Sequence, residues 1–191
     1  ESEPPPRAKM IWVDKPYIDY MPDAQSLEPM VATTPSLIVC KSMSKCYALS
    51  GLRVAYAVSQ KMTELRRFIP PWAVSLPGQL AAVAALRNPA YYRQQYDIIH
   101  QQREELSLLL DEEKFTVLPG VANFILTFLP EHTHHTSSSF IEACKEKGVF
   151  IRDAQNMGVT LTNKAVRFAI RSQKENARIL QCVKEVLSEG Y

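Results

Sequence analysis

Three short apolar runs constrain the fold of this chain more than any other feature of its sequence. They span residues 10–13, 36–40 and 52–58, and each leads into polar residues. Continuous apolar runs of this length predict strands that are buried on both faces of a sheet. In α/β proteins, ligands bind at the carboxyl ends of such strands. We therefore expect an α/β fold with a mostly parallel sheet and with its chemistry at the strand ends.

A second, smaller domain is expected after the helices that follow these runs. Periodicity predicts helices over residues 61–68, 78–86 and 90–112, and the last is long enough to bridge two domains. Strands are then expected at 115–118, 123–128, 149–152 and 166–170, and helices at 138–147 and 174–187, which is typical of a small α+β domain. The expected parts are an extended lead-in (1–8), a partial large domain with the bridging helix (9–112) and the small domain (113–191).

The composition is that of an ordinary globular protein and argues against several kinds of partner. The chain is 46% hydrophobic and 22% charged, with a formal net charge of +2, so we expect it to bind neither nucleic acid nor an anionic membrane. No apolar run reaches the length of about 18 residues that crosses a bilayer. The four cysteines lack CxxC or disulfide-like spacing, which favours reduced thiols and a cytoplasmic location.

No metal site is expected. His132, His134 and His135 stand close together in the sequence, but no acidic or cysteine partner stands at ligand spacing. Their polar surroundings after a predicted strand favour a solvated loop.

Polar residues that could bind a ligand with a cationic group and a phosphate stand at the ends of the first two runs. Asp14 ends the first run, where a buried carboxylate is costly unless it meets a cation. Ser42 and Ser44 follow the second run, and hydroxyl and backbone N–H groups after a strand can bind a phosphate. Arg53 could return to the same phosphate as a charge-assisted partner. Lys45 stands directly after these serines.

These residues resemble the motifs of class I/II pyridoxal phosphate (PLP)-dependent aminotransferases. Residues 14–17 are similar to the D-x-x-Y element, and residues 42–45 with 51–53 are similar to S-x-[ST]-K followed by G-[LM]-R. Asp14 precedes Lys45 by 31 residues, and Arg53 follows it by 8, a joint spacing more specific than either motif. The resemblance implies an aspartate-aminotransferase-like PLP fold with a partial large domain and a small α+β domain.

The resemblance also implies a role for each residue. PLP chemistry requires a lysine for the aldehyde, a carboxylate for the ring nitrogen, a donor for the phenolic oxygen and groups that hold the phosphate. The implied assignments are Lys45 as the catalytic lysine that holds PLP covalently, Asp14 on the ring nitrogen, Tyr17 on the phenolic oxygen, and Ser42, Ser44 and Arg53 on the phosphate.

Later segments extend the resemblance to the substrate site. Residues 71–75 are similar to P-[WY]-x-V-N, residues 122–124 to A-N-[FY], and residues 166–176 to a segment whose arginine binds the substrate α-carboxylate. Arg167 matches that arginine. Arg152, which ends a predicted strand, is expected to bind a second anionic group of the substrate.

Two groups within this superfamily handle phosphorylated substrates and resemble the chain most. Residues 167–172 and 46–53 favour the threonine-phosphate decarboxylases of cobalamin synthesis, which are lyases. Histidinol-phosphate aminotransferases are the alternative, and a non-catalytic PLP-fold domain that acts by binding is a third. The resemblance implies a homodimer with a small amino-acid phosphate as substrate. It covers only the C-terminal half of such an enzyme, so we do not expect this chain alone to be active.

The sequence departs from the family pattern at three places, one of which is Ser75 where the family's P-[WY]-x-V-N element has asparagine. Lys15 stands where the family usually has an acidic residue, which is harmless if its side chain points to solvent. Pro77 and Gly78 bring a helix-breaking pair to the start of the helix expected at 78–86.

Overall fold

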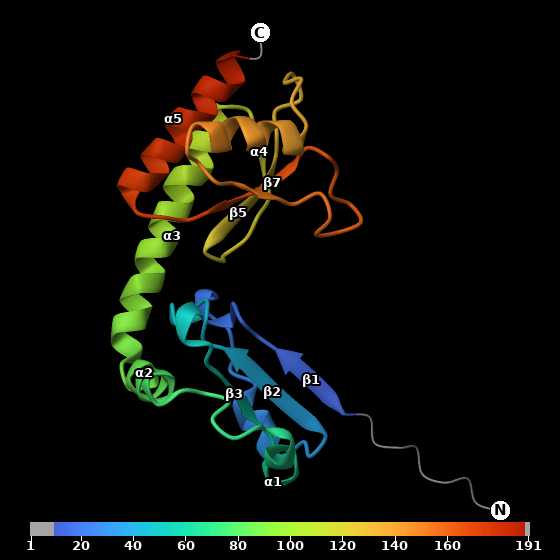
Figure 1. Cartoon of the computed structure of the whole chain (residues 1–191), viewed down its shortest axis with the longest axis vertical. Coiled ribbons are helices and arrows are strands. Elements are labelled where there is room, and N and C mark those ends of the chain that lie inside the picture. The colour runs from blue at the N-terminus through green and yellow to red at the C-terminus, as the bar shows by residue number, and fades with distance from the viewer. Residues whose placement is uncertain (1–9, 190–191) are drawn as a thin grey trace, which may run out of the picture. The chain divides into compact units, whose positions relative to one another are not determined.

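A computed structural model describes residues 10–189 of the 191-residue chain (Figure 1). The chain forms two compact units, one ending at Arg93 and the other beginning at Gln94, so the division falls within helix α3 (Pro89–Glu112). The lead-in expected over residues 1–8 lies outside the described residues. The domain limits expected at residues 112 and 113 stay predictions.

The first unit contains a three-stranded sheet in the order β1-β2-β3. The strands are β1 (Ile11–Asp14), β2 (Leu37–Ser42) and β3 (Ala55–Val58). β1 and β2 are parallel, whereas β3 runs antiparallel to β2, so this part of the sheet is mixed rather than mostly parallel. The third strand is shorter than expected because residues 50–52 form a 3-10 turn, η3 (Ser50–Leu52).

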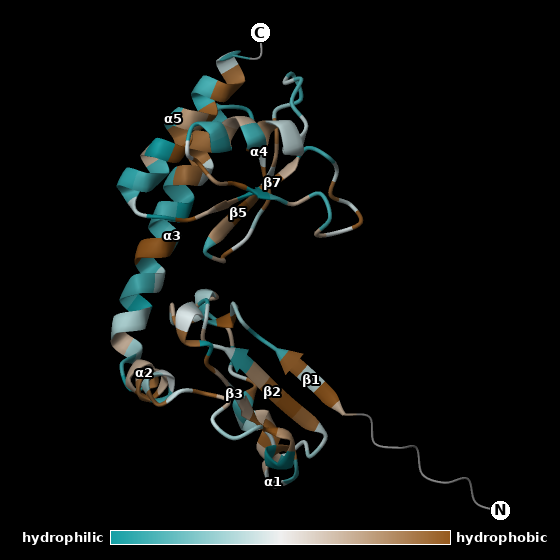
Figure 2. Ribbon diagram, in the orientation of Figure 1, coloured by the Kyte–Doolittle hydropathy of each residue, from teal (hydrophilic) through white to brown (hydrophobic). Residues whose placement is uncertain are grey.

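The burial of β1 differs from the sequence expectation. Ile38 and Val39 on β2 are fully buried, but Ile11 and Trp12 on β1 remain 49% and 60% exposed. Figure 2 shows hydrophobic residues along most of β2. The two runs look alike in sequence, but β1 lies at an edge of the three-stranded sheet and β2 at its centre. The expectation that both faces of β1 are buried was therefore wrong for the described part of the chain.

Short helices complete the first unit. They are η1 (Ile18–Tyr20), η2 (Glu28–Ala32), α1 (Met62–Leu65), η4 (Arg66–Phe68) and α2 (Leu76–Leu86). η2 covers one face of the sheet, where Val31 packs with Leu37 and Val39. The Pro77–Gly78 pair does not break α2, because a proline in the first helical turn loses no hydrogen bond. Ser75 caps this helix by accepting a hydrogen bond of 3.2 Å from the Gly78 N–H.

The second unit is an antiparallel sheet with helices, as expected for an α+β domain. Its strand order is β4-β5-β7-β6. The elements are β4 (Thr116–Val117), β5 (Phe124–Phe128), α4 (Ser137–Glu146), β6 (Arg152–Asp153), β7 (Ala165–Ala169), α5 (Gln173–Glu189) and the later turns of α3. Among residues 10–189, no helix has both the length and the apolar character needed to cross a membrane.

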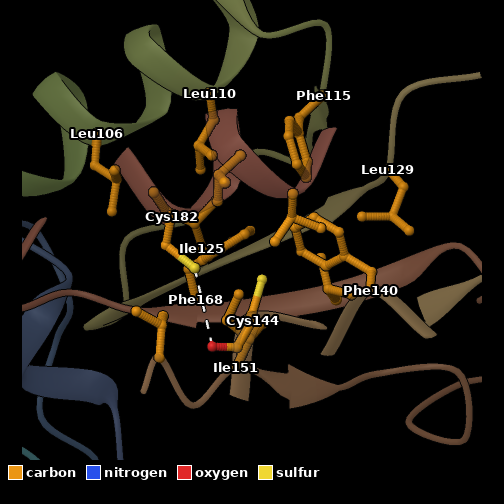
Figure 3. Close-up of a cluster of buried hydrophobic side chains, with 14 residues drawn as sticks. Leu106, Leu110, Phe115, Ile125, Leu129, Phe140, Cys144, Ile151, Phe168 and Cys182 are labelled. Atoms are coloured by element: carbon orange, nitrogen blue, oxygen red, sulfur yellow. Dashed lines mark hydrogen bonds between the residues drawn. The ribbon is translucent and has the colours of Figure 1, made fainter. Parts of the chain in front are cut away.

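One face of this second sheet supplies the core and the other does not. Ile125 and Phe168 are cross-strand partners, and both are buried. Figure 3 shows how they pack with Phe115, which precedes β4, and with side chains from the helices, including Leu106, Leu110, Phe140, Cys144 and Cys182. Side chains alternate between the faces of a strand, so Phe124, Leu126 and Arg167 lie on the opposite face. These three residues are only partly buried.

Candidate active site

Two of the expected cofactor residues share one face of the first sheet. Asp14 on β1 is the register partner of Cys40 on β2, and Ser42 lies two residues beyond Cys40. Register partners and residues two apart on a strand point to the same face. Asp14 and Ser42 therefore lie on one face, at the carboxyl ends of parallel neighbours, where α/β proteins bind ligands. Asp14 is exposed rather than buried as expected, and within residues 10–189 its carboxylate forms no hydrogen bond or ion pair.

The three residues expected to hold a phosphate lie together. Ser42 Oγ donates to Ser44 Oγ over 3.0 Å, and the Ser44 N–H donates to Ser42 Oγ over 3.3 Å. Arg53 Nη1 lies 3.4 Å from Ser44 Oγ and 3.0 Å from the Ser50 carbonyl oxygen. Arg53 has a left-handed backbone, with φ of 53°. This conformation follows η3 and returns the guanidinium to the serines.

Lys45 lies in the turn that follows β2, and the loop after β1 fixes this turn. The Tyr20 hydroxyl donates to the Lys45 carbonyl over 3.3 Å, and Cys46 Sγ donates to the Pro16 carbonyl over 3.2 Å. The side chain of Lys45 is exposed, and no hydrogen bond or ion pair holds its Nζ among the described residues. Tyr17 belongs to the loop that these bonds join to Lys45, with its ring centroid 6.5 Å from that of Tyr20.

The two arginines expected at the substrate site are direct cross-strand partners in the second unit. Arg152 on the edge strand β6 is paired in register with Arg167 on β7. Their side chains therefore leave the sheet on the same face, away from the core. The guanidinium carbon of Arg167 lies 4.7 Å from the ring centroid of Phe124, a cation–π contact that fixes its position.

The residues after Arg167 serve the structure. The buried Asn176 side chain accepts from the Arg171 N–H and donates to the Arg171 carbonyl and to Gln102, each at 3.0 Å. Glu175 accepts from the Ser172 hydroxyl at 2.6 Å and from its N–H at 3.2 Å, while Ser172 Oγ accepts from the Glu175 N–H. These bonds cap the start of α5 and hold the segment that follows β7.

The sequence did not reveal the role of Arg103 on α3. This arginine is buried, and its guanidinium donates to the carbonyl groups of Leu118, Ala122 and Phe124. It therefore anchors the backbone of Phe124, whose ring forms the cation–π contact with Arg167. Burial lowers the pKa of the Arg103 guanidinium.

Two buried lysines were also missed. Lys15 does not point to solvent: it is 6% exposed and forms an ion pair with Glu28 at the start of η2. Lys41 on β2 is 5% exposed and lies 2.5 Å from Asp19 Oδ1 on η1. The local sequence gives no sign of either partner, because Glu28 is 13 residues from Lys15 and Asp19 is 22 residues from Lys41, each on its own 3-10 helix.

The histidine segment gives no metal centre. Among residues 10–189, no group of three or more histidine, cysteine and acidic side chains could hold a metal ion. His135 Nδ1 instead lies 3.1 Å from Ser139 Oγ near the start of α4.

A comparison with protein families identifies the chain. The model of the family "Aminotransferase class I and II" matches residues 8–183. The chain belongs to this family. Aminotransferases of class I and II depend on PLP.

Individual relatives agree with this assignment. The histidinol-phosphate aminotransferase of Oleidesulfovibrio alaskensis is 28% identical over 186 residues, which are 95% of this chain and 48% of that protein. The chain thus spans about half the length of the curated relatives that it matches.

Two solved structures share the fold. The histidinol-phosphate aminotransferase of Sinorhizobium meliloti, solved in complex with PLP, has a TM-score of 0.79 at 23% identity and covers 94% of this chain and 49% of its own. The L-threonine-O-3-phosphate decarboxylase of Porphyromonas gingivalis has a TM-score of 0.78 at 23% identity and covers 93% of this chain and 55% of its own. The PLP-dependent fold expected from the sequence is thereby confirmed.

The residues of this aminotransferase-family chain fit PLP chemically. Ser42, Ser44 and Arg53 form a compact set of donors for a phosphate. Asp14 is a carboxylate without a cationic partner in residues 10–189, and Lys45 is an amine without an acidic one. A cofactor that brings a phosphate, a basic ring nitrogen and an aldehyde would complement each of these groups.

Proposed function

We propose that the complete protein is a PLP-dependent enzyme that acts on an amino acid carrying a phosphate, and that Lys45 is its catalytic lysine. The observation that carries this proposal is the set of Asp14, Ser42, Ser44 and Arg53 around the turn that holds Lys45. Bound PLP supplies an electron-withdrawing ring that stabilises negative charge at the substrate α-carbon.

The cofactor would be held from both ends. The Ser42 and Ser44 hydroxyls and the Arg53 guanidinium would donate to the phosphate, and charge-assisted hydrogen bonds of this kind are roughly twice as strong as neutral ones. The Asp14 carboxylate would keep the ring nitrogen protonated, because a neighbouring anion favours the charged form of a base. Tyr17 would donate to the phenolic oxygen.

Lys45 would have two tasks. Its amine would bind the cofactor aldehyde, and after substrate displaces it, the same amine would move a proton at the substrate α-carbon. Both tasks need an amine that is free to move, and the Nζ of Lys45 is exposed and unpaired within residues 10–189.

Arg167 and Arg152 would bind the two anionic ends of the substrate. A guanidinium can form two parallel hydrogen bonds with a carboxylate or a phosphate. Arg167 is the better positioned for the α-carboxylate because the Phe124 ring restrains it. Arg152 is exposed and would bind the second anion.

The reaction that we favour is transamination, because relatives that match this chain over more than 90% of its length, at 28% and 32% identity, carry the name histidinol-phosphate aminotransferase. Decarboxylation is the second candidate. It is favoured by Arg171 and Ser172 after Arg167, which complete the run that resembles threonine-phosphate decarboxylases, and by the structural likeness to one such enzyme.

Full-length protein tests the proposal. We expect a visible-range absorbance band after PLP is added, and an adduct trapped by borohydride that Lys45→Ala abolishes and the exposed-lysine control Lys174→Ala retains. Amino transfer from glutamate to imidazole-acetol phosphate would support the first reaction, and carbon dioxide release from threonine phosphate the second. PLP binding without either activity would contradict the proposed substrate class, and no PLP binding would leave a non-catalytic domain.

The homodimer implied by the family belongs to the same proposal. Exposed apolar side chains in the first unit support an interface with a second copy of the chain: Phe68 is 84% exposed and Trp72 is 95% exposed. Size-exclusion chromatography of full-length protein with light scattering measures the number of chains.

A further inference from the structure

Two of the proposed cofactor residues each have a buried lysine as their neighbour in sequence. Lys15 follows Asp14, and Lys41 precedes Ser42. Adjacent residues on a strand point to opposite faces. The lysines therefore lie on the face of the sheet opposite to the cofactor residues, under the same two strand ends.

Each lysine is held there by a carboxylate from a covering 3-10 helix. Lys15 Nζ pairs with Glu28 on η2, and the Lys15 N–H still donates to the Cys40 carbonyl of β2 over 3.1 Å. Lys41 Nζ pairs with Asp19 on η1 at 2.5 Å. We call Lys15–Glu28 and Lys41–Asp19 the far-face ion pairs.

Further contacts make the Lys15–Glu28 pair part of a network. Glu28 also accepts hydrogen bonds from the Ser26 hydroxyl and, over 2.9 Å, from the Tyr56 hydroxyl on β3. Tyr56 is the register partner of Lys41. The network therefore joins all three strands and η2 at the end of the sheet where Asp14 and Ser42 lie.

The second pair connects to the lysine turn. Asp19 and Tyr20 are neighbours on η1: Asp19 binds Lys41, and the Tyr20 hydroxyl binds the Lys45 carbonyl. Lys41 Nζ also lies 5.3 Å from the ring centroid of Tyr47, two residues after Lys45. The Lys41–Asp19 pair holds η1 against β2, and the Tyr20 hydroxyl on η1 in turn holds the backbone at Lys45.

The burial of two ammonium groups, even when each is paired, contributes little to the stability of the fold. Buried ion pairs lose most of their attraction to the cost of removing the charges from water, and hydrophobic replacements are often as stable. Their hydrogen-bond geometry, however, restricts where the paired groups can lie.

We propose that the far-face ion pairs are positioning elements for the cofactor: they fix the backbone at Asp14 and Ser42 from the opposite face of the sheet. The proposal rests on the proposed function, because it assumes that Asp14 and Ser42 bind PLP. It assigns Lys15, Glu28, Lys41 and Asp19 a role that acts through their neighbours and not through contact with PLP.

The test compares cofactor affinity with fold stability in full-length protein. Lys15→Met with Glu28→Gln replaces the ion pair with uncharged side chains of similar size and leaves no unpaired charge. The matched control is Lys145→Met with Glu142→Gln, which removes an exposed lysine–glutamate pair on α4. The PLP dissociation constant is measured from absorbance at a temperature where circular dichroism shows each protein folded.

We expect PLP to bind the Lys15→Met/Glu28→Gln protein about 10-fold more weakly, as supporting residues around other bound groups do when changed. The control is expected to stay within about 2-fold of wild type. The pH at which the absorbance spectrum of bound PLP changes should also shift in the Lys15→Met/Glu28→Gln protein. A displaced Asp14 carboxylate would no longer stabilise the protonated ring nitrogen to the same extent.

Three results would contradict either this inference or the proposed function. A lower melting temperature with unchanged PLP affinity and spectrum would show a structural role only and overturn this inference. Failure of wild-type full-length protein to bind PLP would overturn the proposed function instead. If the double variant does not fold, Glu28→Gln alone, which keeps the side-chain shape, must still weaken PLP binding, or the inference is wrong.

Discussion

Arg152 and Arg167 face each other directly across β6 and β7, on the face of the sheet that does not form the core. Like charges at directly opposite positions destabilise an antiparallel pair. No acidic side chain of residues 10–189 forms an ion pair with either arginine. An anionic ligand would remove this repulsion, and the pairing therefore supports the proposal that these two arginines bind an anionic substrate.

Replacing Arg152 with glutamine should separate stability from binding. We expect Arg152→Gln to raise the free energy of unfolding by about 0.5 kcal/mol at low salt, because the cross-strand repulsion disappears. The gain should shrink in about 1 M salt, which screens exposed charges. Denaturant unfolding measures the change.

The same variant should weaken binding of the proposed phosphorylated substrate by about 10-fold or more, since a charge-assisted contact is lost. PLP affinity should remain that of wild type. If Arg152→Gln is less stable than wild type at low salt, the two arginines do not repel each other. If it binds substrate normally, Arg152 does not bind the substrate.

The left-handed backbone at Arg53 gives a second prediction. A non-glycine residue in this conformation costs about 1 kcal/mol, and glycine adopts it freely. Arg53→Gly and Arg53→Ala both remove the guanidinium that lies near Ser44, so both should weaken PLP binding to a similar extent. Thermal unfolding without PLP should find the glycine variant about 1 kcal/mol more stable than the alanine variant; equal stabilities would contradict the strained backbone.

The local sequence predicted the elements and the family well. Most strands and helices lie near the expected positions because hydrophobic periodicity and turn residues are local properties, although the strand expected at 149–152 is instead β6 (Arg152–Asp153). The clustering of Ser42, Ser44 and Arg53 also followed from short spacings within one strand, turn and strand. The binding roles of these residues stay predictions.

Burial was predicted less well, because it depends on partners far along the chain. Ile11 and Trp12 resemble residues of a central strand, yet β1 lies at an edge of the described sheet. The sequence leaves the orientation of Lys15 open, because its partner Glu28 lies on a 3-10 helix that no pattern marked. Arg103 meets carbonyl groups that are 15 to 21 residues away.

Arg103 provides a third prediction, on stability. Arg103→Met keeps an apolar stem but leaves the carbonyl groups of Leu118, Ala122 and Phe124 without their donor. Each buried group without a partner costs about 1–3 kcal/mol. We expect the free energy of unfolding to fall by about 3 kcal/mol in total, because some of the three carbonyl groups would bind water instead. Denaturant unfolding measures it. The exposed Arg93→Met on the same helix is the control, and an equally small effect for both would contradict the anchoring role.

Glu28 provides a prediction on pH dependence. Burial alone would raise the pKa of this carboxyl, but hydrogen bonds from Lys15, Ser26, its own backbone N–H and Tyr56 lower it from an ordinary 4.5 to about 2. The folded protein therefore holds the Glu28 proton less tightly than the unfolded chain does. The resulting stabilisation is fully present above pH 4.5 and is lost as the pH falls towards 2.

Glu28→Gln removes this contribution, because an amide does not titrate in this range. The melting temperature of the variant should lie below that of wild type at pH 6, and the difference should narrow steadily between pH 4.5 and pH 2.5. Tyr56→Phe removes only one of the donors to Glu28, so its difference from wild type should narrow over the same range but start smaller. Calorimetry at pH 6, 4.5 and 3 measures both variants. A difference that stays constant across these pH values would mean that Glu28 does not hold its charge through the Lys15 network, and it would remove the electrostatic support for the far-face ion pairs.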